Sequence, residues 1–137
     1  MKYSVNINQK ALVDNFPELD IVDGAIFDFI KDYISTNGIE KLHKDHKTWY
    51  WISYKKIKDD LPIIGIKTKD AIYRRVKKLA DYDIIQFYPD NQLMNKSYFR
   101  QGSNFEAMIF HKEPTVSKPN PLRIENRTPY GFKTVQL

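Results

Sequence analysis

Six basic side chains stand within the twelve residues from 67 to 78, and their chemistry suits phosphate groups and base edges. A lysine ammonium group attracts phosphate as a point charge and carries little sequence preference. An arginine such as Arg74 can form paired hydrogen bonds with the edge of a guanine, worth about 1–3 kcal/mol of discrimination between bases. If one element presents them together, the lysines can supply affinity for nucleic acid and Arg74 can supply selectivity between bases.

The spacing of apolar residues predicts that this element is a helix from Thr68 to Leu79. Ile72, Val76 and Leu79 fall at i, i+4 and i+7, so they form one stripe toward a core. Thr68 is a good N-cap, and Asp70 in the first turn suits the positive end of the helix dipole. At about 100° per residue, the far side of the helix carries Lys67, Asp70, Arg74, Lys77 and Lys78.

Arg75 is the exception among these cations. At helical spacing it lies only about 60° from Ile72, so we expect it to flank the core rather than face outward.

Composition limits the classes of protein that this chain can represent. With 137 residues and 42% hydrophobic content it is one domain, with room for a tail. The net charge of +5 favours a polyanionic partner, and nearly all positive charge follows residue 40, behind a mildly acidic first part. The absence of cysteine, of a signal-peptide pattern and of an apolar run of about 20 residues leads us to expect a cytoplasmic protein without disulfides or a membrane span.

Elements on either side must position the basic helix. The pattern predicts a helix over 20–36 ended by Asn37-Gly38, a strand over 48–52, and a short helix over 54–61 capped by Ser53. A turn with buried apolar anchors is expected over 62–66. After the basic helix, a hairpin is expected from strands at 84–88 and 97–100 around a turn at 89–92.

The remaining segments carry weaker patterns. Residues 3–7 are expected to form a short strand or an ordered arm, 39–47 a polar loop, and 105–110 an apolar segment of undefined type. Four prolines interrupt the sequence after residue 112, which indicates an extended tail or linker over 112–137. The expected division is an arm or strand over 1–19, a folded domain over 20–111, and that tail.

The order helix, strand, helix, turn, helix, hairpin is that of a winged helix-turn-helix. The block Trp49-Tyr50-Trp51-Ile52-Ser53-Tyr54, then Leu61-Pro62-Ile63-Ile64-Gly65-Ile66, then Lys67-Thr68-Lys69 resembles the winged-helix domain of replication initiators and replisome organisers of phages and other bacterial mobile elements. Members often carry glycine where this chain has Asp83, a residue type that tolerates a left-handed turn. The resemblance covers roughly residues 20–110.

The resemblance implies an α+β fold, a three-helix core with a β-hairpin wing, that binds double-stranded DNA in the bacterial cytoplasm. The second helix of the pair would lie in the major groove, the first would cross the backbone, and the wing would reach the adjacent groove or backbone. The residues expected to contact DNA are Lys55, Lys56, Lys67, Thr68, Lys69, Asp70, Tyr73, Arg74, Lys77, Lys78, Asn91, Gln92, Asn95 and Lys96.

Other functions remain open at this point. A transcriptional regulator or a winged-helix protein-interaction module would share the same fold, and the tail could reach replisome proteins. The apolar helix over 20–36 could serve a homodimer. Trp49 and Trp51 share one strand face and could stack on single-stranded bases, although packing in the core is the better interpretation.

No enzyme is expected, because no catalytic set is visible in the sequence. His43, Asp45 and His46 lack a matching third region for a metal, and Asp59-Asp60 have lysines beside them for ion pairs. We therefore expect neither a metal nor a cofactor.

Overall fold

The computed structural model describes residues 4–91 and 97–110, which form an α+β fold around a four-stranded antiparallel sheet. Within these residues the α-helices are α1 (Gln9–Asn15), α2 (Ile21–Ile34), α3 (Tyr54–Asp60) and α4 (Lys69–Asp81). The strands are β1 (Lys41–Lys44), β2 (Lys47–Trp51), β3 (Ile85–Phe87) and β4 (Tyr98–Gln101). Two short 3-10 turns, η1 (Pro62–Ile64) and η2 (Glu106–Met108), complete the elements.

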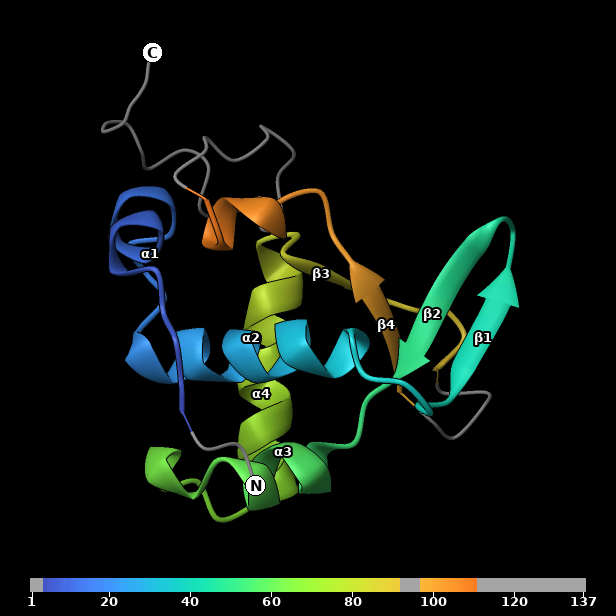
Figure 1. Cartoon of the computed structure of the whole chain (residues 1–137), viewed down its shortest axis with the longest axis horizontal. Coiled ribbons are helices and arrows are strands. Elements are labelled where there is room, and N and C mark those ends of the chain that lie inside the picture. Colours follow the sequence, from blue (N-terminus) through green and yellow to red (C-terminus); the bar gives the residue numbers. More distant parts are fainter. Residues whose placement is uncertain (1–3, 92–96, 111–137) are drawn as a thin grey trace.

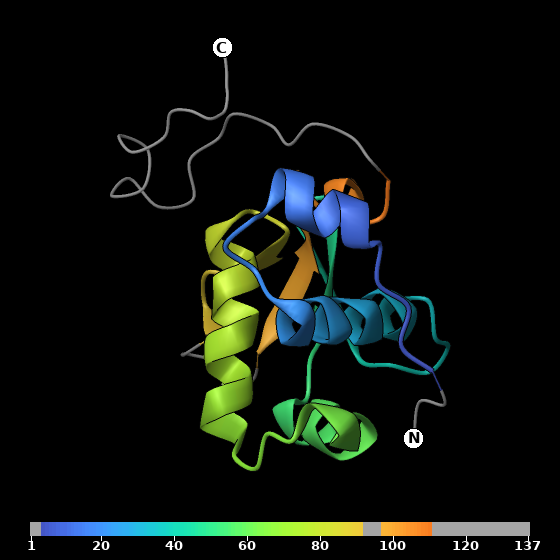
Figure 2. The same ribbon diagram turned by 90° about the vertical axis from the view of Figure 1, so that its left-hand side faces the viewer.

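Helix α2 lies at the centre of the helical part, with α4 crossing it and α1 and α3 at opposite ends (Figures 1 and 2). Its residues 23–30 are all buried, and the carboxylates of Asp23 and Asp28 are buried among the apolar side chains. Asp20 and Asp23 form a reciprocal capping box at its start, and the helix ends at Ile34, two residues short of the predicted bound. This helix is the support against which the basic helix packs.

The two helices α3 and α4 are joined by a tight turn, as predicted. Ser53 caps α3 by accepting from the Lys56 N–H, and Thr68 caps α4 by accepting from the Ala71 N–H, each at 3.1 Å. Gly65 closes the turn with a left-handed φ of 72°. The stripe predicted on α4 is confirmed, because its three apolar residues are fully buried: Ile72, Val76 and Leu79.

The turn itself differs from the prediction in one respect. Ile63 was expected among its buried anchors, yet it is 82% exposed. The 3-10 conformation of Pro62–Ile64 turns this side chain outward while Ile64 and Ile66 pack partly on the core.

The sheet has the order β1-β2-β4-β3 and separates two apolar clusters. On one face Tyr50 and Phe99, which are register partners, pack toward the main core. On the other face Trp49, Tyr88 and Tyr98 form a second cluster, with the Trp49 and Tyr88 rings 5.2 Å apart. Trp49 is only 6% exposed, which confirms that it packs in a core.

Two segments contradict the sequence-based expectations. Residues 41–44, expected in a polar loop, form strand β1, which pairs with β2 around Asp45 and His46. Both turn residues have positive φ, 56° and 64°, which is the backbone of a type I′ hairpin turn. Toward the N-terminus, residues 4–8 form no strand, which leaves the alternative of an arm, and the following residues form an unexpected helix, α1, capped by Asn8.

Helix α1 packs on η2 near the end of the described chain. Asn8 and Asn15 donate from their side-chain amides to the backbone oxygens of Ile109 and Ala107, at 2.7 and 3.0 Å. Ala11 and Leu12 are its buried residues. The segment 1–19, expected as an arm or strand, therefore contributes a helix that covers one end of the core.

The hairpin after α4 forms as predicted, from β3 and β4. Asp83 adopts the left-handed φ of 57° that its position was expected to require. The expected tip residues Gln92, Asn95 and Lys96, and the expected tail over 112–137, lie outside the described residues. None of the helices in the described ranges combines the length and apolar character needed to cross a bilayer.

Candidate nucleic-acid interface

The outward face of α4 presents most of the side chains that the sequence singled out. The residues exposed along it are Lys67, Thr68, Lys69, Asp70, Tyr73, Arg74 and Lys77. Asp70, Arg74 and Lys77 lie opposite the buried stripe, whereas Lys69 and Tyr73 lie at its sides. The packing of α4 on α2 fixes the direction in which this face points. The face therefore gathers ammonium, guanidinium, carboxylate and aromatic groups on one rigid element.

Two lysines at the start of α4 stand apart from the other cations. Lys67 and Lys69 flank the N-cap Thr68, and neither has an ion pair in the part of the chain that the structure describes. The first turn of a helix also exposes backbone N–H groups and the positive end of its dipole. This end of α4 is consequently the most favourable place on the helix for a phosphate.

Most other exposed cations here already face a carboxylate one turn away. Arg74 Nη2 lies 2.8 Å from Asp70 Oδ2, and Lys77 Nζ lies 3.3 Å from Asp81 Oδ1. On α3, the ammonium groups of Lys55 and Lys56 lie 2.6 and 2.9 Å from carboxylate oxygens of Asp59 and Asp60 respectively. Phosphate contacts by these cations would require exchange of one anionic partner for another.

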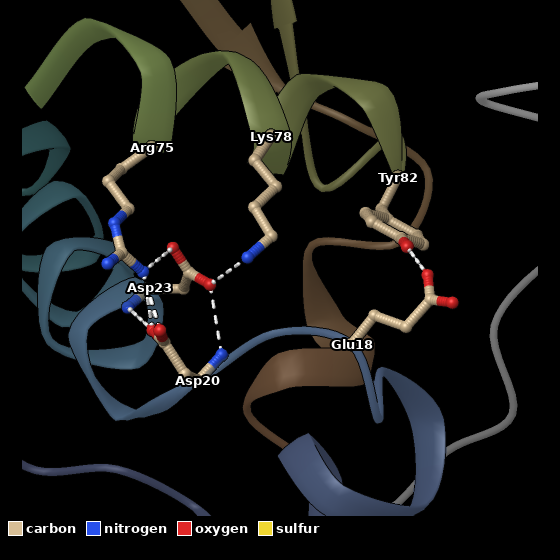
Figure 3. A network of polar contacts seen from close by, with 6 residues as sticks. All are labelled: Glu18, Asp20, Asp23, Arg75, Lys78 and Tyr82. Atoms are coloured by element: carbon tan, nitrogen blue, oxygen red, sulfur yellow. Dashed lines mark hydrogen bonds and ion pairs between the residues drawn. The ribbon is translucent and has the colours of Figure 1, made fainter. Parts of the chain in front are cut away.

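Lys78 does not lie where the sequence placed it. It was expected near a phosphate backbone, but its Nζ donates to the Oδ2 of Asp23 on α2 at 2.9 Å (Figure 3). The reason is that Asp23 is fully buried, and the long lysine stem reaches it along the side of α4. Lys78 therefore belongs to the attachment of α4 rather than to its outward face.

Arg75 joins the same network, as its predicted position beside the core implied. Its Nη1 lies 2.7 Å from both carboxylate oxygens of Asp20 and 3.2 Å from Asp23 Oδ1. Burial alone would raise the pKa of the Asp20 carboxyl, but the hydrogen bonds from Arg75 and from the Asp23 backbone outweigh it and lower the pKa to about 2. The same pairing raises the pKa of Arg75. Two cations of α4 are thus held by two carboxylates at the start of α2.

Tyr73 links the helix pair to the hairpin. Its ring lies 5.6 Å from that of Tyr54 on α3, edge to face, and 6.2 Å from that of Phe87 on β3. Tyr73 keeps 38% of its surface exposed. Tyr54 is more deeply buried, and this burial raises the pKa of its hydroxyl to about 12. Tyr73 therefore presents one side of a fixed aromatic ring on the outward face.

Asn91 was expected to reach a groove from the wing, but its side chain is used inside the hairpin. Its Nδ2 donates to the Tyr98 carbonyl at 3.0 Å, and its Oδ1 accepts from the Tyr98 N–H at 2.9 Å. This pair of bonds continues the ladder between the two arms of the hairpin. The side chain of Asn91 therefore closes the base of the loop.

The histidine segment has a structural use in the β1–β2 hairpin. His43 Nδ1 lies 3.1 Å from Thr48 Oγ1 across the hairpin, and Asp45 and His46 form its turn. Over residues 4–91 and 97–110, no three His, Cys, Asp or Glu side chains are grouped as metal ligands.

The same hairpin carries cations that were assigned to a loop. Lys41, Lys44 and Lys47 are all exposed on it, and Tyr88 raises the pKa of Lys44 by a hydrogen bond. Only the pairing of residues 41–44 with β2 reveals this second basic element.

No protein-family model, no curated protein and no solved structure with which the chain was compared matches it.

Proposed function

We propose that this chain is a winged-helix protein that binds double-stranded DNA, with α4 in the major groove. The order of α2, α3 and α4 followed by the β3–β4 hairpin supports this architecture. The first helix of the pair, α3, brings Lys55 and Lys56 beside the backbone, and the outward face of α4 meets the groove.

The observation that carries the proposal is the pair of lysines at the start of α4. Lys67 and Lys69 are exposed and make no ion pair within the described residues, while the N-terminal half of such a helix is the part that faces bases and phosphates. Arg74 follows one turn later as a group able to bind guanine. Affinity and selectivity groups thus occur together at the end of the helix that enters the groove.

The biological use that we propose is replication initiation or replisome organisation by a phage or mobile element, in the bacterial cytoplasm. Its support is the sequence resemblance over residues 20–110. The tail beyond residue 112 would then reach replisome proteins. A transcriptional regulator with the same domain is the alternative, and target sites in origin-like repeats would favour the first use.

A second candidate function is a protein-interaction module without DNA binding. It is favoured by Ile63, which is 82% exposed in the turn between α3 and α4, and by the carboxylates that already face Arg74 and Lys77. A protein partner would bury this isoleucine and leave the ion pairs in place.

Fluorescence anisotropy with a random duplex and a matched single strand, each titrated across salt, tests the proposal. We expect duplex binding that weakens steeply with salt, because each neutralised phosphate releases counterions. The variant Lys67→Ala/Lys69→Ala should lower affinity for all duplex sequences and reduce the salt slope by about 2. Lys10→Ala on α1, at the opposite end of the helical part from α3, is the control, and its effect is compared per lysine removed.

Two results would contradict the proposal. Absence of duplex binding at low salt would remove the DNA function and favour the interaction module. A preference for the single strand would instead direct attention to the aromatic residues of β2.

A further inference from the structure

We propose that Asp70 and Arg74 act as one selectivity unit that recognises a cytosine beside a guanine and disfavours random DNA. The inference rests on the proposed function, since it concerns the bases that α4 would meet. It begins from the ion pair between Arg74 Nη2 and Asp70 Oδ2, 2.8 Å long and fully on the outward face.

The position of the pair is suited to bases. Asp70 lies in the first turn of α4 and Arg74 one turn later, and both lie about 200° around the helix from Ile72, which is fully buried. Their side chains are 67% and 78% exposed. The polar tips of the two side chains lie 2.8 Å apart, close to the rise of about 3.4 Å between adjacent base pairs. One helical turn therefore presents both groups to neighbouring base pairs.

The chemistry of the pair differs from that of the lysines beside it. A carboxylate repels phosphate and the acceptor atoms of guanine and thymine, but it accepts from the N4 amino group of cytosine. An arginine donates to the O6 and N7 atoms of guanine. On a cytosine-guanine step, Asp70 can accept from the cytosine and Arg74 can donate to the guanine, so both replace their ion pair with contacts to bases. On other sequences, Asp70 either finds no donor on a base or stays paired with Arg74, which then cannot bind a base.

The cations in and beside α4 therefore have different roles. Lys67 and Lys69, without ion pairs in the described residues, would bind any duplex. The negative charge of Asp70 weakens binding to any duplex that does not offer it a cytosine amino group. Selectivity then comes partly from an unfavourable contact with the wrong sites. Arg75 and Lys78 take no part, because Asp20 and Asp23 hold them against α2.

The experiment combines random-duplex anisotropy with selection of preferred sites from a randomised duplex pool. Asp70→Asn removes the charge and keeps the shape of the side chain. We expect it to bind random duplex about 3-fold or more tightly at low salt, since one repulsive charge near phosphates is lost. At one selected position, cytosine should give way to adenine, the base that asparagine prefers.

Two further variants complete the design. Arg74→Ala should lose the neighbouring guanine while keeping salt-dependent binding. Asp14→Asn is charge-matched, because Asp14 also sits in an i,i+4 ion pair, with Lys10, but on α1. It should leave random-duplex affinity and the selected sites unchanged. Circular dichroism of each variant confirms that the fold is retained.

The outcomes separate the two levels of the argument. If the unaltered chain binds no duplex, the proposed function and this inference fail together. If it binds duplex but Asp70→Asn changes neither affinity nor the selected bases, only the inference fails. An equal rise in affinity for Asp14→Asn and Asp70→Asn would also overturn it, because the effect would then reflect net charge.

Discussion

Gly102 lies directly against the backbone of Asp83, so closely that a Cβ atom at Gly102 would be 2.1 Å from the Asp83 carbonyl oxygen. The contact joins the turn after α4 to the segment after β4. The Gly102 N–H donates to Ile84 O, and the Asn104 N–H donates to Asp83 O, both at 2.9 Å. Only a residue without a side chain allows the hairpin to return this close to the end of α4.

Gly102→Ala should therefore lower the free energy of unfolding by about 2–3 kcal/mol, because a backbone atom rather than a flexible side chain must move. Urea unfolding measures the change. Gly38→Ala is the control: Gly38 has a φ of 86° but no atom within 4 Å of its added Cβ. Its cost should be about 1–2 kcal/mol, from backbone conformation alone. A Gly102→Ala variant as stable as the original chain would show that the hairpin is not held here.

The attachment of α4 to α2 gives a second prediction. Asp23 is fully buried and accepts from the Asp20 N–H, Arg75 and Lys78. Asp23→Ala should lower the free energy of unfolding by about 2–4 kcal/mol, because it leaves these donors without their buried acceptor. Asp59→Ala removes an exposed ion pair with Lys55 and should change stability far less, because water screens that pair. Similar losses from both variants would contradict a structural role for the network.

Acid titration of stability tests Asp20 in the same network. Its folded pKa of about 2 lies below the usual 3.8, so its contribution is present above about pH 4 and is lost as the pH falls toward 2. Asp20→Asn keeps an N-cap acceptor but cannot titrate. The difference in unfolding free energy between the two chains should shrink as the pH falls from 4 to 2.

Arg75→Gln provides the complementary test, because the guanidinium is what holds the Asp20 carboxylate charged. In that variant the Asp20 pKa should rise toward its usual value, and Asp20→Asn should then have little further effect on the acid side. A constant difference between the original chain and Asp20→Asn over this pH range would refute the linkage.

The sequence predicted the elements whose signals are local. The cap at Thr68 and the stripe from Ile72 to Leu79 belong to one segment, so α4 was placed nearly to the residue. Strand β1 was missed because its pattern Lys-Leu-His-Lys has low strand propensity and depends on pairing with β2. Helix α1 was missed because its seven residues bury only Ala11 and Leu12, too few to define a period.

In the candidate site too, positions that depend on local spacing could be predicted, and positions that depend on distant residues could not. The outward position of Arg74 follows from helical spacing, but the position of Lys78 depends on Asp23, 55 residues earlier in the chain. A buried carboxylate on another helix cannot be inferred from the pattern of α4. Asn91 was likewise assigned to the wing surface because its backbone partner Tyr98 is known only once the hairpin is built.

The two tryptophans of β2 give a final prediction, which concerns the single-strand alternative. Trp49 is buried and contacts Tyr88 and the Arg100 guanidinium, whose carbon lies 5.7 Å from the ring centre, while Trp51 is half-buried. With Trp51→Phe, the remaining fluorescence comes from Trp49 and should be quenched weakly by acrylamide. With Trp49→Phe, it comes from Trp51 and should be quenched more strongly. A single-stranded oligonucleotide should leave the Trp49 signal unchanged, because a buried ring offers no face for a base. Strong quenching of Trp49, or a change on adding the oligonucleotide, would show that this cluster opens and would restore the stacking platform as an explanation.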